Sequence, residues 1–289
     1  MKENGTVISH EHGELHAALA DNAWLQVAQA TSAAGRFAKK TLTIVGLEVR
    51  KLRHDSTELV TRAIQPALWL LIFGEVFSQV RAIPTGNLRY LDFMAPGILA
   101  QSVLFIAIFY GIAIIWERDL GIIHKLLVSP TPRTALVLGK ALSAGVRGLT
   151  QAVIVYALAL LLGVQVNWNP WALLGVLVVV VLGSALFSSF SLIVACIVKT
   201  RERFMGVGQI LTMPLFFASN AIYPIAIMPH WLQVIARGNP LTYEVDALRT
   251  LMLNGGESIY GLLPDFGVLL GATTILVVLA GRMYPNVVR

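Results

Sequence analysis

The sequence predicts an all-α polytopic membrane protein, in which six membrane-spanning helices follow an amphipathic helix near the N-terminus. Several apolar runs are each close to the roughly 20 residues that an α-helix needs to cross the hydrocarbon of a bilayer. Only 13% of the 289 residues are charged, whereas a soluble domain usually carries about 25%. The mean hydropathy of +0.71 agrees with this fold class, because lipid then covers the apolar faces.

Residues 1–36 are expected to form a flexible cytoplasmic tail, because they are polar, alanine-rich and without the basic-then-apolar order of a cleavable signal. Within this tail, "HEHGELH" (residues 10–16) raises the question of a metal site. Its spacing differs from the HExxH pattern that places two histidines and a glutamate on one helix face. We therefore expect a solvated segment and no bound metal.

Residues 37–63 form the predicted amphipathic helix. Its apolar positions recur at helical spacing and are Leu42, Val45, Val49 and Leu52. Basic residues fill the remaining face, at Lys39, Lys40, Arg50, Lys51 and Arg53. This pattern is typical of a helix that lies flat on an anionic membrane surface, and an ordinary soluble helix is the alternative.

Six predicted spans follow within residues 64–289. They cover residues 66–80, 96–116, 141–164, 171–198, 204–227 and 262–281. The first span is short and contains Glu75, while Pro214 and Pro224 interrupt the fifth. Each span is near the length that a bilayer requires.

Lysine and arginine predict the orientation, because they concentrate in cytoplasmic segments next to the spans. With the N-terminus inside, the inner segments hold Lys39 to Arg62, then Arg118, Lys125, Arg133 and Lys140, then Lys199, Arg201 and Arg203, and finally Arg282 and Arg289. The outer segments hold only Arg81, Arg89, Arg237 and Arg249. We therefore predict a multi-pass protein of the cytoplasmic membrane with both termini in the cytoplasm.

The segment between the second and third predicted spans, residues 117–140, is called the elbow here. Asp119 is a suitable N-cap for a short helix with an apolar stripe at Leu120, Ile123 and Leu127. Two prolines in residues 129–132 stop that helix, and a new helix begins near Thr134. The elbow is either an anchor on the membrane surface or a docking knob for a soluble subunit, and periodicity does not separate the two.

The segment before the last span, residues 228–253, is called the cap here. Its charged residues would each cost several kcal/mol at the bilayer centre, so it is not expected to cross. Its apolar residues nevertheless keep helical spacing, at Leu241, Val245, Leu248 and Met252. Two short helices, broken at residues 238–240 and dipping into the outer leaflet, fit this pattern.

Three stretches resemble the permeases of type-2 ABC exporters. "ERDLGIIHKLLVSPTPRTALVLGK" (residues 117–140) is similar to the signature loop of that family, and "NPLTYEVDALR" (residues 239–249) to its second signature. "LWLLIFGEVF" (residues 68–77) is similar to the family's first span, and the resemblance covers residues 40–285. The drug-resistance branch (daunorubicin type) and the nodulation-factor branch are the most similar.

The resemblance implies a homodimer of two six-span permeases above two ATP-binding subunits on separate chains. Residues 37–63 would be a connecting helix, and the elbow a coupling helix that contacts the ATPase through Glu117, Arg118, Asp119, Gly121, His124, Lys125 and Arg133. The cap would be a re-entrant pair that includes Asn239, Pro240, Tyr243, Glu244, Asp246 and Arg249. Cargo would be a drug, a lipid or a lipid-linked glycan.

The residues themselves place nucleotide chemistry elsewhere. "GVGQ" (residues 206–209) lacks the lysine of a phosphate-binding loop, so ATP and Mg²⁺ are expected on a partner subunit. We identify no catalytic, cofactor or metal residues and expect a transport subunit that is not an enzyme. The single cysteine, Cys196, excludes an internal disulfide, and we expect no nucleic-acid partner.

Polar residues inside the spans are candidates for the cargo path. They are Gln101, Arg147, Gln151, Gln209 and Asn220. Arg147 is alternatively a side chain that reaches back to the cytoplasmic surface. The competing function is an ion-coupled secondary transporter or channel without an ATPase, which would need intramembrane carboxylates or histidines that the sequence does not clearly supply.

Overall fold

The computed structural model describes residues 35, 46, 63–80, 83–86, 88–123, 133–198 and 200–284. The predicted tail (residues 1–36) and the amphipathic helix (residues 37–63) therefore lie outside the described residues, apart from three positions. The helices are η1 (Trp69–Gly74), α3 (Glu75–Val80), α4 (Tyr90–Asp119), α6 (Arg133–Leu161), α7 (Pro170–Ile197), α8 (Arg201–Phe217), η2 (Ile225–Ile227), α9 (His230–Gly238), α10 (Pro240–Met252) and α11 (Leu262–Met283).

Four of these helices are long and apolar enough to cross a membrane: α4, α6, α7 and α11, with 30, 29, 28 and 22 residues. They coincide with the predicted second, third, fourth and sixth spans, which confirms a helical polytopic membrane protein. At the first predicted span the described residues are helical from 63 to 80, through the six-residue π-helix η1 and then α3. The helix at the fifth predicted span, α8, is shorter than the four long helices, with 17 residues.

The predicted fifth span, residues 204–227, was too long. Helix α8 runs through Pro214 and ends at Phe217, because a residue from the cap takes over its last carbonyls. The Nδ2 atom of Asn239 donates to the carbonyls of Leu215 (2.6 Å) and Ala218 (2.9 Å). The second predicted span also needs correction, because α4 continues past Trp116 to Asp119.

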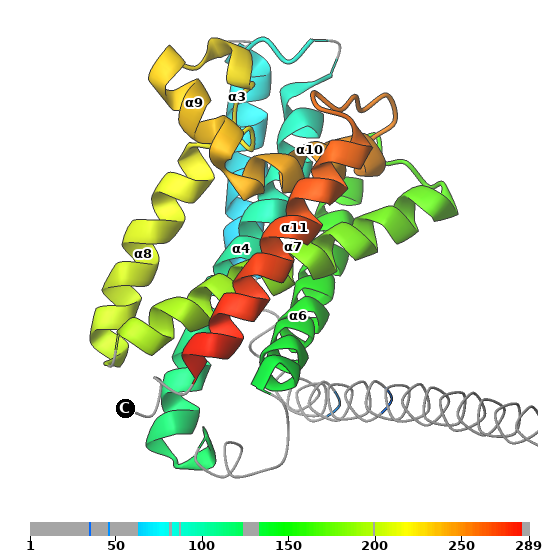
Figure 1. Ribbon diagram of the computed structural model, residues 1–289. Coiled ribbons are helices and arrows are strands. Elements are labelled where there is room, and N and C mark those ends of the chain that lie inside the picture. Colours follow the sequence, from blue (N-terminus) through cyan, green and yellow to red (C-terminus); the bar gives the residue numbers. More distant parts are fainter. Residues whose placement is uncertain are drawn as a thin grey trace, which may run out of the picture.

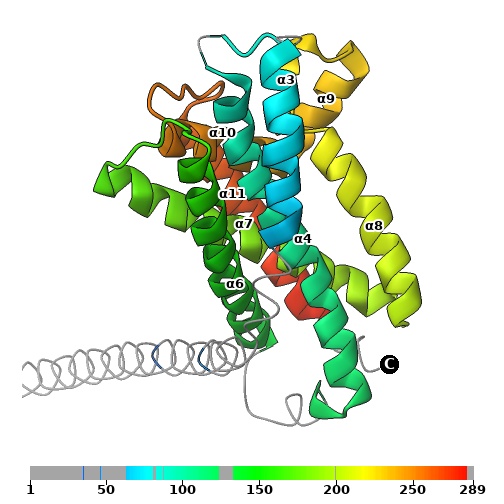
Figure 2. The ribbon, with the colours of Figure 1, turned by 180° about the vertical axis from the view of Figure 1, so that it is seen from behind.

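The long helices cross in a bundle with α4 and α7 at its centre (Figures 1 and 2). Helix α4 contacts α6, α7, α8 and α10, and α7 contacts α6, α10 and α11. Helices α9 and α10 lie together at one end of the bundle, called the cap end. The end of α4 and the start of α6 lie at the opposite end, called the elbow end.

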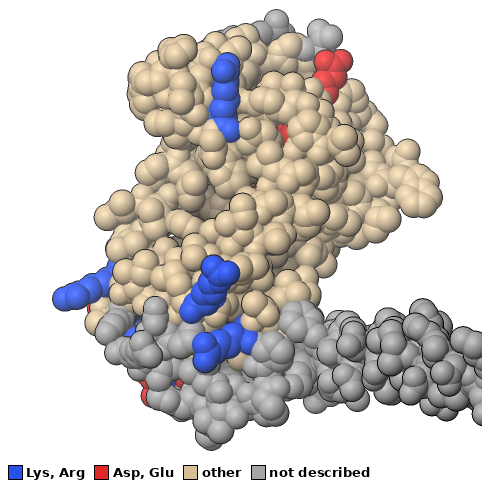
Figure 3. Space-filling view, viewed as in Figure 1, with Lys and Arg blue, Asp and Glu red and all other residues tan. Residues whose placement is uncertain are grey.

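The outer faces of the bundle are apolar. Large side chains on α6, α7 and α11 are strongly exposed, among them Val153 (70%), Trp171 (79%) and Leu263 (86%). Figure 3 shows a broad uncharged band between charged side chains near the two ends of this face. Such a band is what lipid contact requires, because charged groups in hydrocarbon are costly.

Candidate functional site

Helix α10 begins at a joint between the cap and α8. The Oδ1 atom of Asn239 accepts from the N–H of Leu241 (3.0 Å), which caps α10, and Pro240 follows at the first helical position. The same side chain binds the end of α8 through Nδ2. The predicted break at residues 238–240 is therefore confirmed, and Asn239 ties the two helices together there.

Asp246 holds the loop that leads from α10 into α11. Its Oδ2 atom accepts from the hydroxyl of Ser258 (2.8 Å) and from the N–H groups of Ile259 (2.8 Å) and Tyr260 (3.1 Å). Asp246 is fully buried, so these donors replace the water that the carboxylate loses. Asp246 thus fixes the path of the chain toward the last long helix.

Arg249 connects α10 to α4 and to the turn after α8. Its Nε and Nη2 atoms donate to the carbonyl of Phe93 (3.4 and 3.3 Å), and Nη2 donates to the carbonyl of Asn220 (2.7 Å). The guanidinium also lies 3.8 Å from the centre of the Phe93 ring, which is a cation–π contact. Only 4% of the residue is exposed.

Glu244 is a buried carboxyl packed on the backbone of α7. A Cβ atom on Gly183 would lie 2.2 Å from its Oε1 atom, so a larger residue there would force the carboxyl to move. Neither carboxyl oxygen has a hydrogen-bond partner among the described residues. Burial raises the pKa of Glu244 well above its usual range, because a buried carboxylate loses its hydration. Burial therefore favours the neutral, protonated form of this carboxyl.

Tyr243 joins the two cap helices. Its hydroxyl donates to the carbonyl of Arg237 (2.7 Å), and its ring centre lies 5.0 Å from that of Tyr260. The predicted cap residues therefore form one joint between α4, α7, α8, α9 and the loop before α11. Within it Pro240 and Tyr243 are half-buried, and the buried members are Asn239, Glu244, Asp246 and Arg249. The sequence placed these residues together but did not show which of them point inward.

At the elbow end, Glu117 is engaged within the chain. Its Oε2 atom pairs with the Nζ atom of Lys140 near the start of α6, and the two side chains are only 13% and 6% exposed. This ion pair joins the last turn of α4 to α6. Lys140 was the final residue of the predicted elbow, but nothing in its spacing marked it as the partner of Glu117.

Asp119 ends α4 and pairs with two arginines, which corrects its expected N-cap role. Its Oδ1 atom lies 2.8 Å from Nη2 of Arg118, and its Oδ2 atom lies 2.8 Å from Nη2 of Arg201 at the start of α8. Arg201 also lies over the ring of Trp116, 3.5 Å from its centre. The end of α4 is thereby attached to α8.

Gly121 turns the chain away from α4. Its φ of 70° is in the left-handed region that favours glycine, and its N–H donates to the carbonyl of Arg118 (2.9 Å). Beyond this turn the apolar residues separate: Leu120 is 67% exposed and Ile122 40%, whereas Ile123 is fully buried. The single stripe predicted through Leu120 and Ile123 is therefore wrong.

The remaining coupling candidates are only partly described. His124 and Lys125 lie outside the described residues. Arg133 is exposed at the first position of α6, which begins one residue before the predicted start. The described part of the elbow therefore offers exposed apolar side chains beside the charged groups of Arg118 and Asp119.

Among the cavities that the described residues line, none brings the candidate path residues together. Gln101, Gln151 and Asn220 are buried in α4, α6 and the turn after α8, and Gln209 is exposed on α8. The guanidinium of Arg147 lies 5.5 Å from the ring centre of Tyr110. None of the five lines either of two larger cavities, of about 500 Å³ at the cap end and about 440 Å³ between α6 and α7. Sequence reasoning missed both cavities, because residues far apart in the chain line them.

This architecture defines a polytopic helical membrane protein with a polar joint inside one end and exposed charged groups at the other. In the residues that the structure describes, no group of three or more histidine, cysteine, aspartate or glutamate side chains could hold a metal ion.

The chain belongs to the ABC-2 type transporter family, because the sequence model of that family matches residues 40–253. It is 31% identical over 208 residues to ycf38 of Cyanophora paradoxa, covering 70% of each chain. It is 25% identical to the daunorubicin resistance ABC transporter permease protein DrrB1 of Streptomyces coeruleorubidus, covering 85% of this chain and 86% of that protein. It is 27% identical to the inner membrane transport permease YadH of Escherichia coli K12, covering 73% and 80%.

Proposed function

We propose that the chain is the permease subunit of an ATP-driven exporter, and that a separate ATP-binding subunit drives it. The observation that carries this proposal is the exposed tip of the elbow, in a chain of this family that has no phosphate-binding loop of its own. Leu120 and Ile122 extend apolar side chains beyond the end of α4, beside Arg118 and Asp119. An apolar knob with a charged rim suits a cleft in a soluble partner.

Force from the partner would enter the bundle by two routes. The Glu117–Lys140 pair links the elbow to α6, and the Asp119–Arg201 pair links it to α8. Helix α8 reaches the cap through Asn239. Closure of two ATPase subunits on ATP and Mg²⁺ would thus move α8 and the cap relative to the centre of the bundle. This movement would either alternate the access of the cargo path between the two sides of the membrane or open the exit for cargo.

The positive-inside rule supports the elbow end in the cytoplasm with both termini, and the cap at the outer surface. In this orientation η1 with α3, together with α8, would complete six spans. Residues 37–63 would lie on the inner surface as the connecting helix. The coupling residues of the elbow would then face the compartment that supplies ATP.

A second copy of the chain would complete the transport path. Helix α8 stands at one edge of the bundle (Figures 1 and 2). It contacts α4 more extensively than it contacts α7. It exposes Gln209 in the middle of its length, and a polar side chain at membrane depth requires a polar partner or water. A homodimer with α8 near the two-fold axis would supply either one.

The cargo would be an amphiphile, such as a drug, a lipid or a lipid-linked glycan. The long helices carry few charged side chains, which suits a partly apolar molecule better than a bare ion. The drug-resistance name of one relative favours the same class.

The test is transport by the chain in sealed vesicles, with and without the proposed ATP-binding partner subunit. We expect a fluorescent amphiphile, such as daunorubicin or a labelled lipid, to move only when both the partner and ATP are present. Movement that needs an ion gradient and no ATPase would instead establish the ion-coupled secondary transporter.

A further inference from the structure

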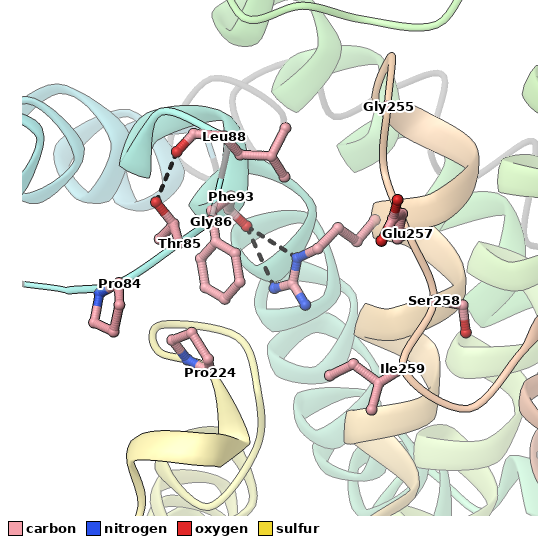
Figure 4. Close-up of a pocket in the computed structure, with 11 residues that line it drawn as sticks. Pro84, Thr85, Gly86, Leu88, Phe93, Pro224, Gly255, Glu257, Ser258 and Ile259 are labelled. Atoms are coloured by element: carbon pink, nitrogen blue, oxygen red, sulfur yellow. Dashed lines mark hydrogen bonds between the residues drawn. The ribbon is translucent and has the colours of Figure 1, made fainter.

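A cavity of about 500 Å³ opens at the cap end, between three segments that are distant in sequence. Figure 4 shows Pro84, Thr85 and Gly86 on one side and residues 255–259 on the other, with Pro224 between them. Phe93, Pro224 and Ile259 make much of the wall apolar. The volume is in the range of small-molecule sites.

Arg249 supplies a buried positive charge to this cavity. The bonds that hold its guanidinium use Nε and Nη2, and their acceptors are the neutral carbonyls of Phe93 and Asn220. Among the described residues no hydrogen bond engages Nη1, and no carboxylate lies within ion-pair distance of the side chain. The charge is therefore held by neutral carbonyls, and the carboxylates that act on it do so from beyond ion-pair distance.

The acidic residues nearby offset this charge only in part. Asp246, on the same helix, acts on Arg249 through space, but its Oδ2 atom is occupied by three donors from residues 258–260, and its Oδ1 atom has no hydrogen-bond partner among the described residues. Glu257 lines the cavity as well, but it is an exposed residue of the 255–259 loop. Water hydrates an exposed carboxylate, so Glu257 offsets only part of a buried charge.

We infer that this cavity binds the phosphate group of an amphiphile, with the phosphate oxygens on the guanidinium of Arg249 and the adjoining stem against Phe93 and Pro224. Arginine suits this ligand, because its planar donors match phosphate oxygens. The shared chemistry is a phosphate ester, carried either by a lipid headgroup or by a free phosphate. As a statement about exported cargo the inference rests on the proposed function, whereas the binding itself does not.

A substitution of Glu257 provides a second test of the inference, because its expected effect on the affinity for the same ligand is opposite in sign to that of a substitution of Arg249. Removal of a nearby negative charge strengthens the binding of an anion, whereas removal of Arg249 weakens it. Glu257 is exposed, and its side chain makes no hydrogen bond or ion pair among the described residues, so Glu257→Gln leaves the fold intact. Arg249→Lys is the conservative variant, because it keeps the charge and loses the planar pair of donors.

The test measures ligand binding by the purified full chain in neutral detergent, with no ATPase present. Native mass spectrometry would follow dihexanoyl phosphatidic acid, with net-neutral dihexanoyl phosphatidylcholine as the comparison and inorganic phosphate as a competitor. We expect the phosphatidic acid to bind at least tenfold more tightly than the phosphatidylcholine. We expect binding of phosphatidic acid to weaken about tenfold in Arg249→Gln and about threefold in Arg249→Lys, and to strengthen about threefold in Glu257→Gln.

Competition by inorganic phosphate would support a site that also takes free phosphate, and its absence would support a lipid headgroup. Equal affinity of the wild type, Arg249→Gln and Glu257→Gln for phosphatidic acid would overturn the inference. If Arg249→Gln does not fold, an unchanged affinity for phosphatidic acid in the conservative variant Arg249→Lys overturns it. A failure of ATP-driven transport would bear on the proposed function and not on this binding.

Discussion

The cap and the elbow are both short polar segments between apolar helices, yet they differ in how far their side chains are exposed. In the cap, Glu244, Asp246 and Arg249 are buried, and the last two bind backbone groups of neighbouring segments. In the elbow, Arg118 and Asp119 lie beside the exposed side chains of Leu120 and Ile122. The charged side chains of the cap are therefore enclosed by the chain, whereas the elbow exposes the apolar side chains of Leu120 and Ile122.

The elbow itself contains both kinds of contact. Glu117 and Ile123 face the bundle, where they meet Lys140 and the apolar residues around Leu136 and Leu192. Leu120 and Ile122 face outward. Mutations of the inward residues are thus expected to lower the stability of the fold, whereas mutations of the outward residues are expected to weaken coupling to the ATPase. This difference between neighbouring residues tests the contrast between buried and exposed contacts directly.

The largest effect is expected for Glu117→Ala, which leaves Lys140 buried without its carboxylate. Breaking a buried pair by removing one partner costs about 3–5 kcal/mol, so the free energy of unfolding of the purified chain should fall by that order. Thermal unfolding in detergent measures the loss. The exchange variant Glu117→Lys with Lys140→Glu should recover part of it, and an unchanged melting temperature in Glu117→Ala would contradict the pairing.

A smaller loss is expected at the cap for Asp246→Ala. Three donors in residues 258–260 lose their acceptor, and buried donors without partners cost about 1–3 kcal/mol each, partly relieved by water. We expect about 2–4 kcal/mol of destabilisation, together with faster amide hydrogen exchange at Ile259 and Tyr260. Asp246→Asn keeps one acceptor oxygen and should lose less. Protection unchanged in Asp246→Ala would show that the loop does not depend on this carboxylate.

The smallest effect is expected for Glu244→Gln, because a protonated carboxyl and an amide are similar in size and both are neutral. The change at pH 7 should stay below about 1 kcal/mol. The raised pKa means that the folded chain holds a proton that the unfolded chain releases. Wild-type stability should therefore fall as the pH rises above about 4.3, the ordinary value for glutamate.

The Glu244→Gln variant lacks this pH-dependent contribution to the free energy of unfolding. Melting temperatures between pH 5 and pH 8 should therefore decline less in Glu244→Gln than in the wild type. An equal decline in the two proteins would show that Glu244 does not retain its proton.

The parts of the fold that the sequence predicts correctly are those with local causes. Continuous apolar runs locate α4, α6, α7 and α11, and Asn239 with Pro240 marks the break in the cap. The errors have distant causes. Helix α8 stops where Asn239 binds its carbonyls from 21 and 24 residues away, and periodicity within residues 204–227 contains no trace of that contact.

The site follows the same rule. Resemblance to a family identified the charged residues of the cap and the elbow, but not the direction in which they point. Glu117 was expected to contact a partner and is paired with Lys140, 23 residues later. The cavity beside Arg249 needed three segments to come together, so no single motif could reveal it.

The central claim is that the exposed tip of the elbow receives the force of a separate ATPase. The direct measurement is ATP hydrolysis by the chain purified with its ATP-binding partner, comparing Leu120→Asp with Ile122→Asp against Val234→Asp with Ile235→Asp. The control pair lies on α9 and is similarly exposed, at 57% and 50%. The account predicts that the elbow pair loses the partner or lowers permease-dependent hydrolysis about tenfold, equivalent to about 1.4 kcal/mol, while the α9 pair does not. Unchanged assembly and hydrolysis in the elbow pair would contradict it.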